Sequence, residues 1–520
     1  MKAIREQNVV AAALACGLGF TSTALLAQDV PPTPAAPVLA QPEDFVRSFA
    51  NTPIMDPVAD PSKPKTIIRQ SYDGVDFLGS HCGCLPPDTN AAVGNGFVVE
   101  TVNVQIRIFS KANGSVLLDE PLSTFFGAPS GGDVYVVYDD TANRWYVSAF
   151  DSNATGLFLA VSKDGNPLDG FLPTYHLTNV GGFPDYNKPG FNKDAIFISF
   201  NNFGPGGGSA ATIASIDKAA ALSGTLTYFV SHPKFQFRAM PPAQMHRDKD
   251  RDEHREGDRD EHREKDHDEH HDKDHDKNMA GVEWFVSTDG TDAGGNTIRV
   301  TKMTNYLSNA PVFTYTSLPV TPYRNAPRAD QPGGSVTTFP NTTTTQVQFH
   351  KGHLVTALAS SVATDGFVYP KGLYYKIDVR GGTPILLKEG KIDPGPGVAV
   401  QMPSVDFDSN GRLGLTWMES SSTEFLSMWV ATVNKAGKLV AAVAAPGGGF
   451  FAVSFRIGDY STTVLDRSDD KDTFWSANEY IGNDGRSDIW RTHITSFRAK
   501  SGDDDDHHKD DHKDDHVAEK

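Results

Sequence analysis

Residues 131–150 read GGDVYVVYDDTANRWYVSAF, two short runs rich in Val, Tyr, Phe and Trp on either side of a polar turn, DDTANR. β-Branched and aromatic side chains suit a pleated, half-buried surface, so each run is typical of a β-strand. The stretch therefore predicts a β-hairpin. Whether this hairpin is part of a repeat fold depends on whether its pattern recurs along the chain.

The pattern of apolar strand, polar turn and second apolar strand does recur. It is found in AAVGNGFVVETVN at 91–103, KPGFNKDAIFISF at 188–200, TQVQFHKGHLVTALA at 345–359, SVDFDSNGRLGLTWM at 404–418 and TTVLDRSDDKDTFWSANEY at 462–480. A further strand-like run follows each pair, and a seventh unit begins near Pro241 and resumes as GVEWFVSTDG. The units start near residues 88, 133, 185, 241, 335, 404 and 459, a period of about 45–65 residues that is longest across a charged insertion.

Four antiparallel strands that recur at this period are typical of β-propeller blades, which stack around a central channel. The sequence therefore predicts an all-β fold, a propeller over residues 66–500 with seven blades of four antiparallel strands; six or eight blades remain alternatives. Because the last unit is short, TIIRQSYDGVDF at 66–77 is expected to supply its outer strand and close the ring. A stack of separate β-sandwiches is the structural alternative.

The first 65 residues have a different composition. Lys2 and Arg5 precede the apolar run VVAAALACGLGFTSTALLA, which predicts a signal peptide over 1–27; a lipoprotein anchored through Cys16 is the alternative. A Pro-rich leader follows at 28–65. No later run approaches the ~20 apolar residues of a spanning helix, so we expect an exported protein, periplasmic or extracellular, with no transmembrane segment.

Charge is concentrated in two low-complexity segments. The formal net charge is −18, of which residues 246–278 contribute −6 and residues 503–520 another −6. The first segment is a His/Asp/Lys-rich insertion within the propeller and the second belongs to an acidic His-rich tail at 501–520. Apart from Val517 and Ala518 neither has apolar side chains to bury, so both are expected to be disordered. A basic footprint for nucleic acid is missing, which argues against such a partner.

Four stretches carry a family resemblance: PPDTNAAVGNGFVV at 86–99, GGDVYVVYDDTANRWYVSAF at 131–150, GFPDYNKPGFNKDAIFISF at 182–200, and RIGDYSTTV, FWSANEY and IWRT within 456–492. Together they resemble bacterial exported β-propeller proteins that are loosely labelled sialidase-like or Asp-box-like. The resemblance implies a secreted or periplasmic propeller and carries no catalytic residue. The Arg-Ile-Pro signature of sialidases does not occur in the sequence.

An aspartate recurs near the start of the innermost predicted strand of several units. These residues are Asp88, Asp133, Asp185, Asp406 and Asp459, with Asp330 as a candidate sixth. Strand starts converge on one mouth of a propeller channel, where a ring of carboxylates would hold Ca²⁺. The alternatives are that each Asp bonds backbone N–H groups of its own turn, or that a close pair supplies a general acid and base.

Aromatic and polar side chains lie near the same motifs. Tyr186, Tyr460, Trp475 and Tyr480 are expected to pack between blades, with stacking on a sugar or peptide as the alternative. Asn478 and Glu479 matter to function only if they face the channel.

The histidines form a second candidate metal site, because eleven of the 17 lie in the two charged segments. Neutral imidazole suits Zn²⁺, Cu²⁺ or Ni²⁺, and carboxylates can complete the shell. The alternative is a solvated, solubilising insertion. The candidate ligands are His254, His262, His270, His271, His507 and His508.

Two cysteines follow the leader, Cys82 and Cys84 in HCGC. They are expected to form a local disulfide or to stay as loop thiols, and metal ligation together with His81 is the alternative.

The sequence as a whole favours a monomeric binding or scaffold protein for a glycan or protein ligand of the envelope or exterior, with accessory divalent-metal binding. The alternative is a hydrolase or lyase that acts on a polysaccharide or peptide at the channel mouth.

Overall fold

The computed structural model describes residues 66–204, 209–234, 238, 240–246, 281–288, 294–336, 342–433, 437–452, 454, 456–468, 471–482 and 489–499. The chain divides into two compact units, residues 1–63 and 64–520, and the first lies wholly outside the described residues. The expected signal peptide, leader and tail, and all of the charged insertion after His246, also lie outside them. A helix long and apolar enough to cross a membrane does not occur in the described part of the chain.

Four separate sheets each contain four antiparallel strands. Three of them are built from consecutive strands, and the fourth combines the two ends of the described chain. They are β2 (Thr89–Gly94), β3 (Phe97–Val102), β4 (Gln105–Ser110) and β5 (Val116–Pro121); β6 (Ser130–Asp139), β7 (Arg144–Asp151), β8 (Leu157–Val161) and β9 (Tyr175–Leu177); β24 (Ala399–Phe407), β25 (Leu413–Ser421), β26 (Glu424–Val433) and β27 (Leu439–Ala445); and β28 (Thr462–Leu465), β29 (Phe474–Ile481), β30 (Trp490–Ala499) and β1 (Thr66–Asp76).

The middle of the chain forms one larger sheet. In it the short strand β14 (Ala243–Met245) pairs in parallel with β10 (Phe183–Phe191) and β20 (Val347–His350), and β17 (Val312–Arg324) pairs antiparallel with β21 (His353–Val362). This sheet contains two antiparallel groups of four and one of three. They are β10 (Phe183–Phe191), β11 (Ala195–Phe203), β12 (Ser209–Asp217) and β13 (Tyr228–Ser231); β20 (Val347–His350), β21 (His353–Val362), β22 (Lys371–Asp378) and β23 (Ile385–Ile392); and β15 (Val282–Thr288), β16 (Gly295–Thr304) and β17 (Val312–Arg324).

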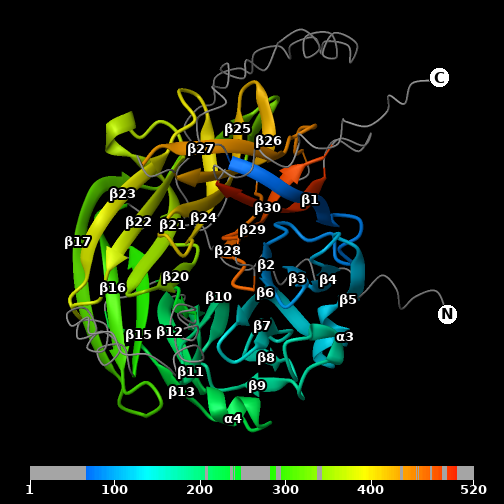
Figure 1. The fold of residues 1–520 in the computed structure, drawn as a ribbon, viewed down its shortest axis with the longest axis vertical. Coiled ribbons are helices and arrows are strands. Elements are labelled where there is room, and N and C mark those ends of the chain that lie inside the picture. The colour runs from blue at the N-terminus through cyan, green and yellow to red at the C-terminus, as the bar shows by residue number, and fades with distance from the viewer. Residues whose placement is uncertain are drawn as a thin grey trace, which may run out of the picture. The chain divides into compact units, whose positions relative to one another are not determined.

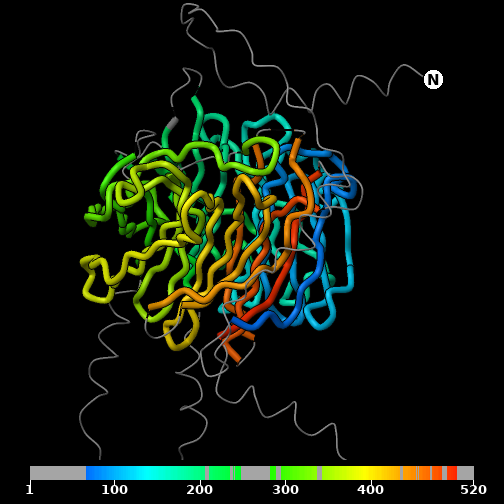
Figure 2. Tube along the Cα trace, turned by 90° about the horizontal axis from the view of Figure 1, so that it is seen from above, coloured from blue at the N-terminus to red at the C-terminus, as the bar shows by residue number. Residues whose placement is uncertain are grey.

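The strand groups surround a common centre, with β2, β6, β10, β20, β24 and β28 nearest to it (Figure 1). Figure 2 shows the strands running between the two faces of this ring. The chain is therefore a β-propeller, as the repeat predicts. The count of seven blades stays a prediction, because β14 pairs with the inner strands of the neighbouring groups, whereas the group of β15 is joined to this segment by one isolated bridge, Pro242–Phe285.

Two predicted unit starts are wrong. The unit expected near residue 335 begins at β20, because Ala329–Gln331 and Gly334–Val336 pair with each other as a separate two-stranded sheet, β18 and β19. The unit expected at 404 begins at residue 399, since a register shift between Gln401 and Ser404 lies inside β24 and hides its first half from a strict alternation pattern.

The ring closes as expected. β1 pairs antiparallel with β30 from Thr66–Ala499 to Asp76–Arg491 and so becomes the outermost strand of the C-terminal sheet. The Thr66 hydroxyl also donates to the carbonyl of Val440 in the adjacent sheet at 2.7 Å. Joining the two ends of the fold in one sheet covers the edge of β30, which would otherwise present unpaired N–H and C=O groups.

The opening hairpin is β6 and β7, and its turn has a specific anchor. Asp139 Oδ1 accepts the N–H groups of Thr141 and Ala142 at 3.0 Å each, and Asn143 adopts φ 53°. Asp139 Oδ2 accepts a bond from Lys218 Nζ in the neighbouring group; both side chains are buried. The polar turn therefore fixes the hairpin and also joins it to the next group.

Candidate functional site at the strand starts

The inner strands begin with an irregular backbone. Asp88, Asp133 and Tyr186 have φ of 59°, 50° and 55°, in the left-handed region that Asp and Asn tolerate better than most residues. The register shifts between Gly132 and Tyr135 in one group and between Asp185 and Lys188 in the next. Such bulges re-aim side chains, and here they accompany a cluster of charged groups.

Four of the five predicted aspartates come together at this end of the channel. Asp459, Asp133 and Glu479 raise the pKa of Asp88, whose largest cause of elevation is burial. Burial likewise raises the pKa of Asp185, and Asp133 and Asp459 add to it. The side chains of Asp88, Asp133, Asp185 and Asp459 therefore form one cluster, which we call the aspartate cluster.

Asp406 is not part of the aspartate cluster, and Asp330 is exposed in β18. The strand β24 begins at Ala399, five residues before the predicted start at residue 404. Asp406 therefore lies near the end of this strand, as its penultimate residue. Met402, with φ 43°, occupies the bulge of β24. The prediction that Asp406 lies at the strand start is therefore wrong.

The aspartates bond the main chain of neighbouring groups. Asp133 Oδ2 accepts the N–H of Tyr186 at 2.7 Å, and Asp88 Oδ1 accepts the N–H of Asp459 at 3.2 Å. Asp406 follows the same rule elsewhere, since its Oδ2 accepts the N–H of Leu465 at 2.7 Å. The expected bonds to backbone N–H groups thus exist for Asp88, Asp133 and Asp406, but these three bonds cross between strand groups.

Two of these carboxyl groups also bond each other. A side-chain hydrogen bond with Asp185 lowers the pKa of Asp133, against the larger effect of burial, which raises it. When two carboxyl groups lie this close together, the pKa of one is raised above that of the other.

Two basic residues share the aspartate cluster. The Arg456 guanidinium donates to Asp459 Oδ2 and lowers the pKa of Asp88, Asp133 and Asp185 against the effect of burial. The second basic residue is Lys188. The cluster therefore combines four carboxyl groups with one guanidinium and one amine. A group of three or more His, Cys, Asp or Glu side chains arranged for a metal ion is not found among the described residues, and Ca²⁺ binding at this mouth stays a prediction.

Lys188 is held by aromatic rings. Its Nζ lies 3.7 Å from the ring centroid of Tyr460, 4.0 Å from that of Tyr186 and 5.1 Å from that of Tyr135. The residue is only 2% exposed, and burial lowers the pKa of its amine well below the usual value, although Asp133, Asp459 and Asp88 act in the opposite direction. Ring faces attract the cation and partly replace its lost water.

One cavity within the channel is nearly filled. The cavity among the inner strands β2, β6, β14 and β28 has a volume of about 10 Å³. That is close to the smallest space that holds one water molecule. A sugar or a peptide segment cannot enter this cavity.

The other predicted residues are structural. Trp475 and Tyr480 are buried, and the Tyr480 hydroxyl donates to Asp73 Oδ1 at 2.7 Å, which confirms that these aromatics pack within the fold. Asn478 Nδ2 donates to the carbonyl of Met402 at 3.1 Å, and a Glu479 oxygen accepts the N–H of Thr89 at 3.4 Å. Both join neighbouring groups.

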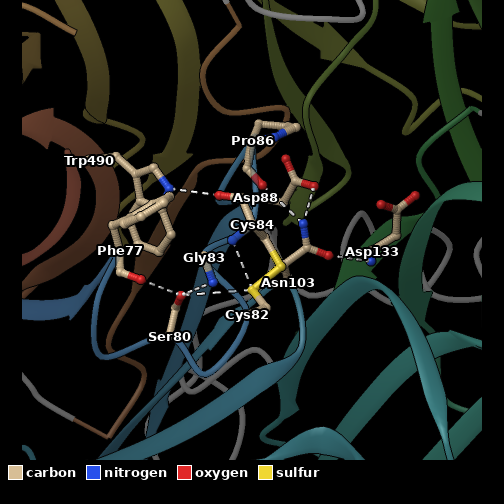
Figure 3. Close-up of a disulfide and its surroundings, with 10 residues drawn as sticks. All are labelled: Phe77, Ser80, Cys82, Gly83, Cys84, Pro86, Asp88, Asn103, Asp133 and Trp490. Atoms are coloured by element: carbon tan, nitrogen blue, oxygen red, sulfur yellow. Dashed lines mark hydrogen bonds between the residues drawn. A yellow bond between two sulfur atoms is a disulfide. The ribbon is translucent and has the colours of Figure 1, made fainter. Parts of the chain in front are cut away.

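Cys82 and Cys84 form a disulfide, with their Cα atoms 5.1 Å apart (Figure 3). The bond uses both sulfur atoms, so metal ligation by His81 with the two thiols is excluded. Trp490 Nε1 donates to the carbonyl of Cys84 at 2.8 Å, and Asn103 Nδ2 donates to the carbonyl of Pro86 and to Asp88 Oδ2 (Figure 3). The disulfide loop is thus attached to the start of β2 and to the aspartate cluster.

Lys188, Arg456 and Tyr135 were not predicted to belong to this site. A signal was present for Lys188, because it lies two positions after Tyr186 and a regular strand would place both side chains on one face. The six predicted histidine ligands, His254, His262, His270, His271, His507 and His508, lie outside the described residues.

Comparison with known proteins adds no family: no family model and no curated protein sequence matches the chain. Similar solved structures include the WD40 domain of SCAP from fission yeast (10% identity, 79% of this chain and 84% of that chain, TM-score 0.33) and a protein of unknown function from Dyadobacter fermentans (12%, 84% and 98%, 0.36). Another is the subtype N11 neuraminidase-like protein of A/flat-faced bat/Peru/033/2010 (8%, 74% and 96%, 0.34). Such weak similarity carries no argument about ligand or activity, and the sialidase-like label stays a prediction.

Proposed function

We propose that this β-propeller is an exported, non-catalytic binding or scaffold protein that engages a glycan or protein ligand on its outer surface. One observation carries the proposal: the cavity among β2, β6, β14 and β28 is about 10 Å³, and Asp88, Asp133 and Asp406 accept main-chain N–H groups of neighbouring strand groups. Carboxylates that make these bonds connect the strand groups of the ring. So small a cavity favours recognition at the rims over chemistry inside it.

Accessory divalent-metal binding belongs to the same proposal and rests on the composition of the two His-rich segments. Imidazole and carboxylate side chains at this density are ligands for Zn²⁺, Cu²⁺ or Ni²⁺. Because imidazole releases its metal when protonated, binding is expected to weaken below about pH 6.

Calorimetric titration with Zn²⁺ and with Ca²⁺ tests both metal proposals. The sample is the chain from residue 28, compared with a variant in which residues 247–278 are replaced by a short Gly-Ser linker and 503–520 are removed. We expect Zn²⁺ binding only in the first protein. Equal Zn²⁺ binding by both proteins would place the ligands elsewhere, and Ca²⁺ binding that survives in the variant but disappears with Asp133→Asn would place Ca²⁺ at the aspartate cluster.

One observation favours a second candidate, a hydrolase acting at the channel mouth. Asp133 and Asp185 share a hydrogen bond, and burial raises the pKa of both. A protonated carboxyl beside an ionised one is what general acid–base hydrolysis requires. Assays on mixed polysaccharides and on unfolded protein decide between the candidates: turnover that is lost in Asp185→Asn but retained in Asp169→Asn, an exposed position, would replace the binding proposal.

A further inference from the structure

The far end of the channel holds a second polar group of side chains. Asp140, His246 and Arg467 follow the inner strands β6, β14 and β28, whereas the aspartate cluster lies at the starts of such strands. All three line the cavity of about 10 Å³, together with apolar and polar side chains of the strands themselves.

Arg467 has hydrogen-bond donors that the described residues do not fill. Its side chain is 6% exposed, and its Nε and Nη2 atoms are buried without a hydrogen-bond partner among those residues. The facing carboxylate, Asp406 Oδ1, is 3.8 Å from Nη2, which is too far for a hydrogen bond. Asp406 is instead engaged by the main-chain N–H groups of Phe407 and Leu465, at 2.7 Å each.

His246 presents a third unfilled position. Its Nδ1 lies 2.7 Å from Asp140 Oδ1, and its ring meets the edge of Phe191 at a centroid distance of 5.1 Å. The side chain is 8% exposed, and Nε2 is buried with no partner in the described part of the chain. Because Nδ1 bonds the carboxylate, Nε2 is the ring nitrogen that stays open to a ligand.

We propose that this cavity holds one small anion of the halide class between Arg467 and His246. The unfilled atoms are guanidinium and imidazole nitrogens, and a guanidinium keeps its charge at any working pH. The charged groups facing the position are Arg467, His246, Asp140 and Asp406, and both carboxylates already accept hydrogen bonds. The cavity excludes phosphate, sulfate and carboxylate ligands by size. This site is independent of the surface binding proposed above.

Two measurements on the full chain test the site. Crystals grown in sodium bromide should give an anomalous bromine peak between the Arg467 guanidinium and His246 Nε2. The unfolding midpoint should be higher in sodium chloride than in sodium gluconate of equal ionic strength, because gluconate is too large to enter and a bound anion stabilises the folded state. Arg467→Gln should abolish this difference, and Arg412→Gln should retain it.

Arg412 is the matched control because its guanidinium pairs with Asp408 at the same end of the channel and does not line the cavity. The proposal is overturned if crystals of the unmodified chain show only a water at this position, or if the two salts give the same midpoint. The crystallographic result stands even where Arg467→Gln fails to fold.

Discussion

The carboxylate of Asp133 accepts the main-chain N–H of Tyr186 at 2.7 Å, although the two residues lie near the starts of strands in different sheets. The bond is partly buried at the mouth of the channel, near Lys188 and Arg456. Asp88 and Asp406 make the same kind of contact with Asp459 and Leu465. The recurrent aspartate thus connects neighbouring strand groups. Its contribution to the free energy of unfolding can be measured by substitution.

Replacing Asp133 should destabilise the ring. In Asp133→Ala the N–H of Tyr186 loses its acceptor, and an unsatisfied buried donor costs about 1–3 kcal/mol. Asp133→Asn should cost less, because its amide oxygen still accepts the bond. The free energy of unfolding from urea titration measures both, and Asp169→Ala, at an exposed position, is the control. Equal loss in the Ala and Asn variants would mean that charge, not the Tyr186 bond, is what matters.

Removing β1 should open the ring. A chain that begins at Leu78 lacks the strand that pairs with β30 along its length, so it exposes a sheet edge and tends to associate. We expect a lower unfolding midpoint and self-association in sedimentation velocity. A chain that begins at Thr66 is the matched control and should unfold cooperatively as a monomer. An unchanged midpoint without β1 would show that the pairing contributes little.

The repeat could be recognised from sequence because strand patterns and turns are local. The hairpin at 131–150 and the closing strand at 66–77 each carry their own signal, in β-branched residues and in an Asp-containing turn. Two starts were misplaced where that local rule fails. β24 contains a bulge at Met402, and Ala329–Val336 forms a small sheet that no periodicity distinguishes from the start of a unit.

The candidate site was only partly predictable, for a related reason. Strand starts of a propeller meet at one mouth, so the meeting of Asp88, Asp133, Asp185 and Asp459 follows from topology. The groups that contact these aspartates cannot be derived from topology. The Tyr186 N–H and the cation Lys188 reach Asp133 across a boundary between sheets, and such contacts depend on the stagger of neighbouring strands, which composition does not encode.

Stability should fall as the pH rises from about 5 to 8. Burial raises the pKa of Glu419 to about 8 and that of Glu100 to about 7, both from a usual value of 4.5. In this interval the folded state binds more protons than the unfolded state, so each group lowers the free energy of unfolding by up to about 1.4 kcal/mol per pH unit until its folded pKa is passed. Urea titrations at pH 5, 6, 7 and 8 measure the slope.

Glu419→Gln isolates one of these two groups. The glutamine oxygen can still accept the bond that Trp417 Nε1 makes to Glu419 Oε2 at 2.8 Å, so packing is kept while the titration is removed. The variant should lose part of the slope and gain stability at pH 8. Asp169→Asn should leave the slope unchanged. A full slope in Glu419→Gln would mean that Glu419 does not take up its proton on folding.

The buried pair of Asp139 and Lys218 should show strong coupling. Their side chains are 0% and 5% exposed, and Asp139 also accepts the Tyr146 hydroxyl at 3.0 Å. Lys218→Met leaves a buried carboxylate without its cation, which costs about 3–5 kcal/mol. Adding Asp139→Asn to Lys218→Met should recover part of that loss, because no unpaired charge then remains, so the double-mutant cycle has a large interaction free energy. Additive losses would contradict the pairing and show that each side chain is stabilised by other contacts.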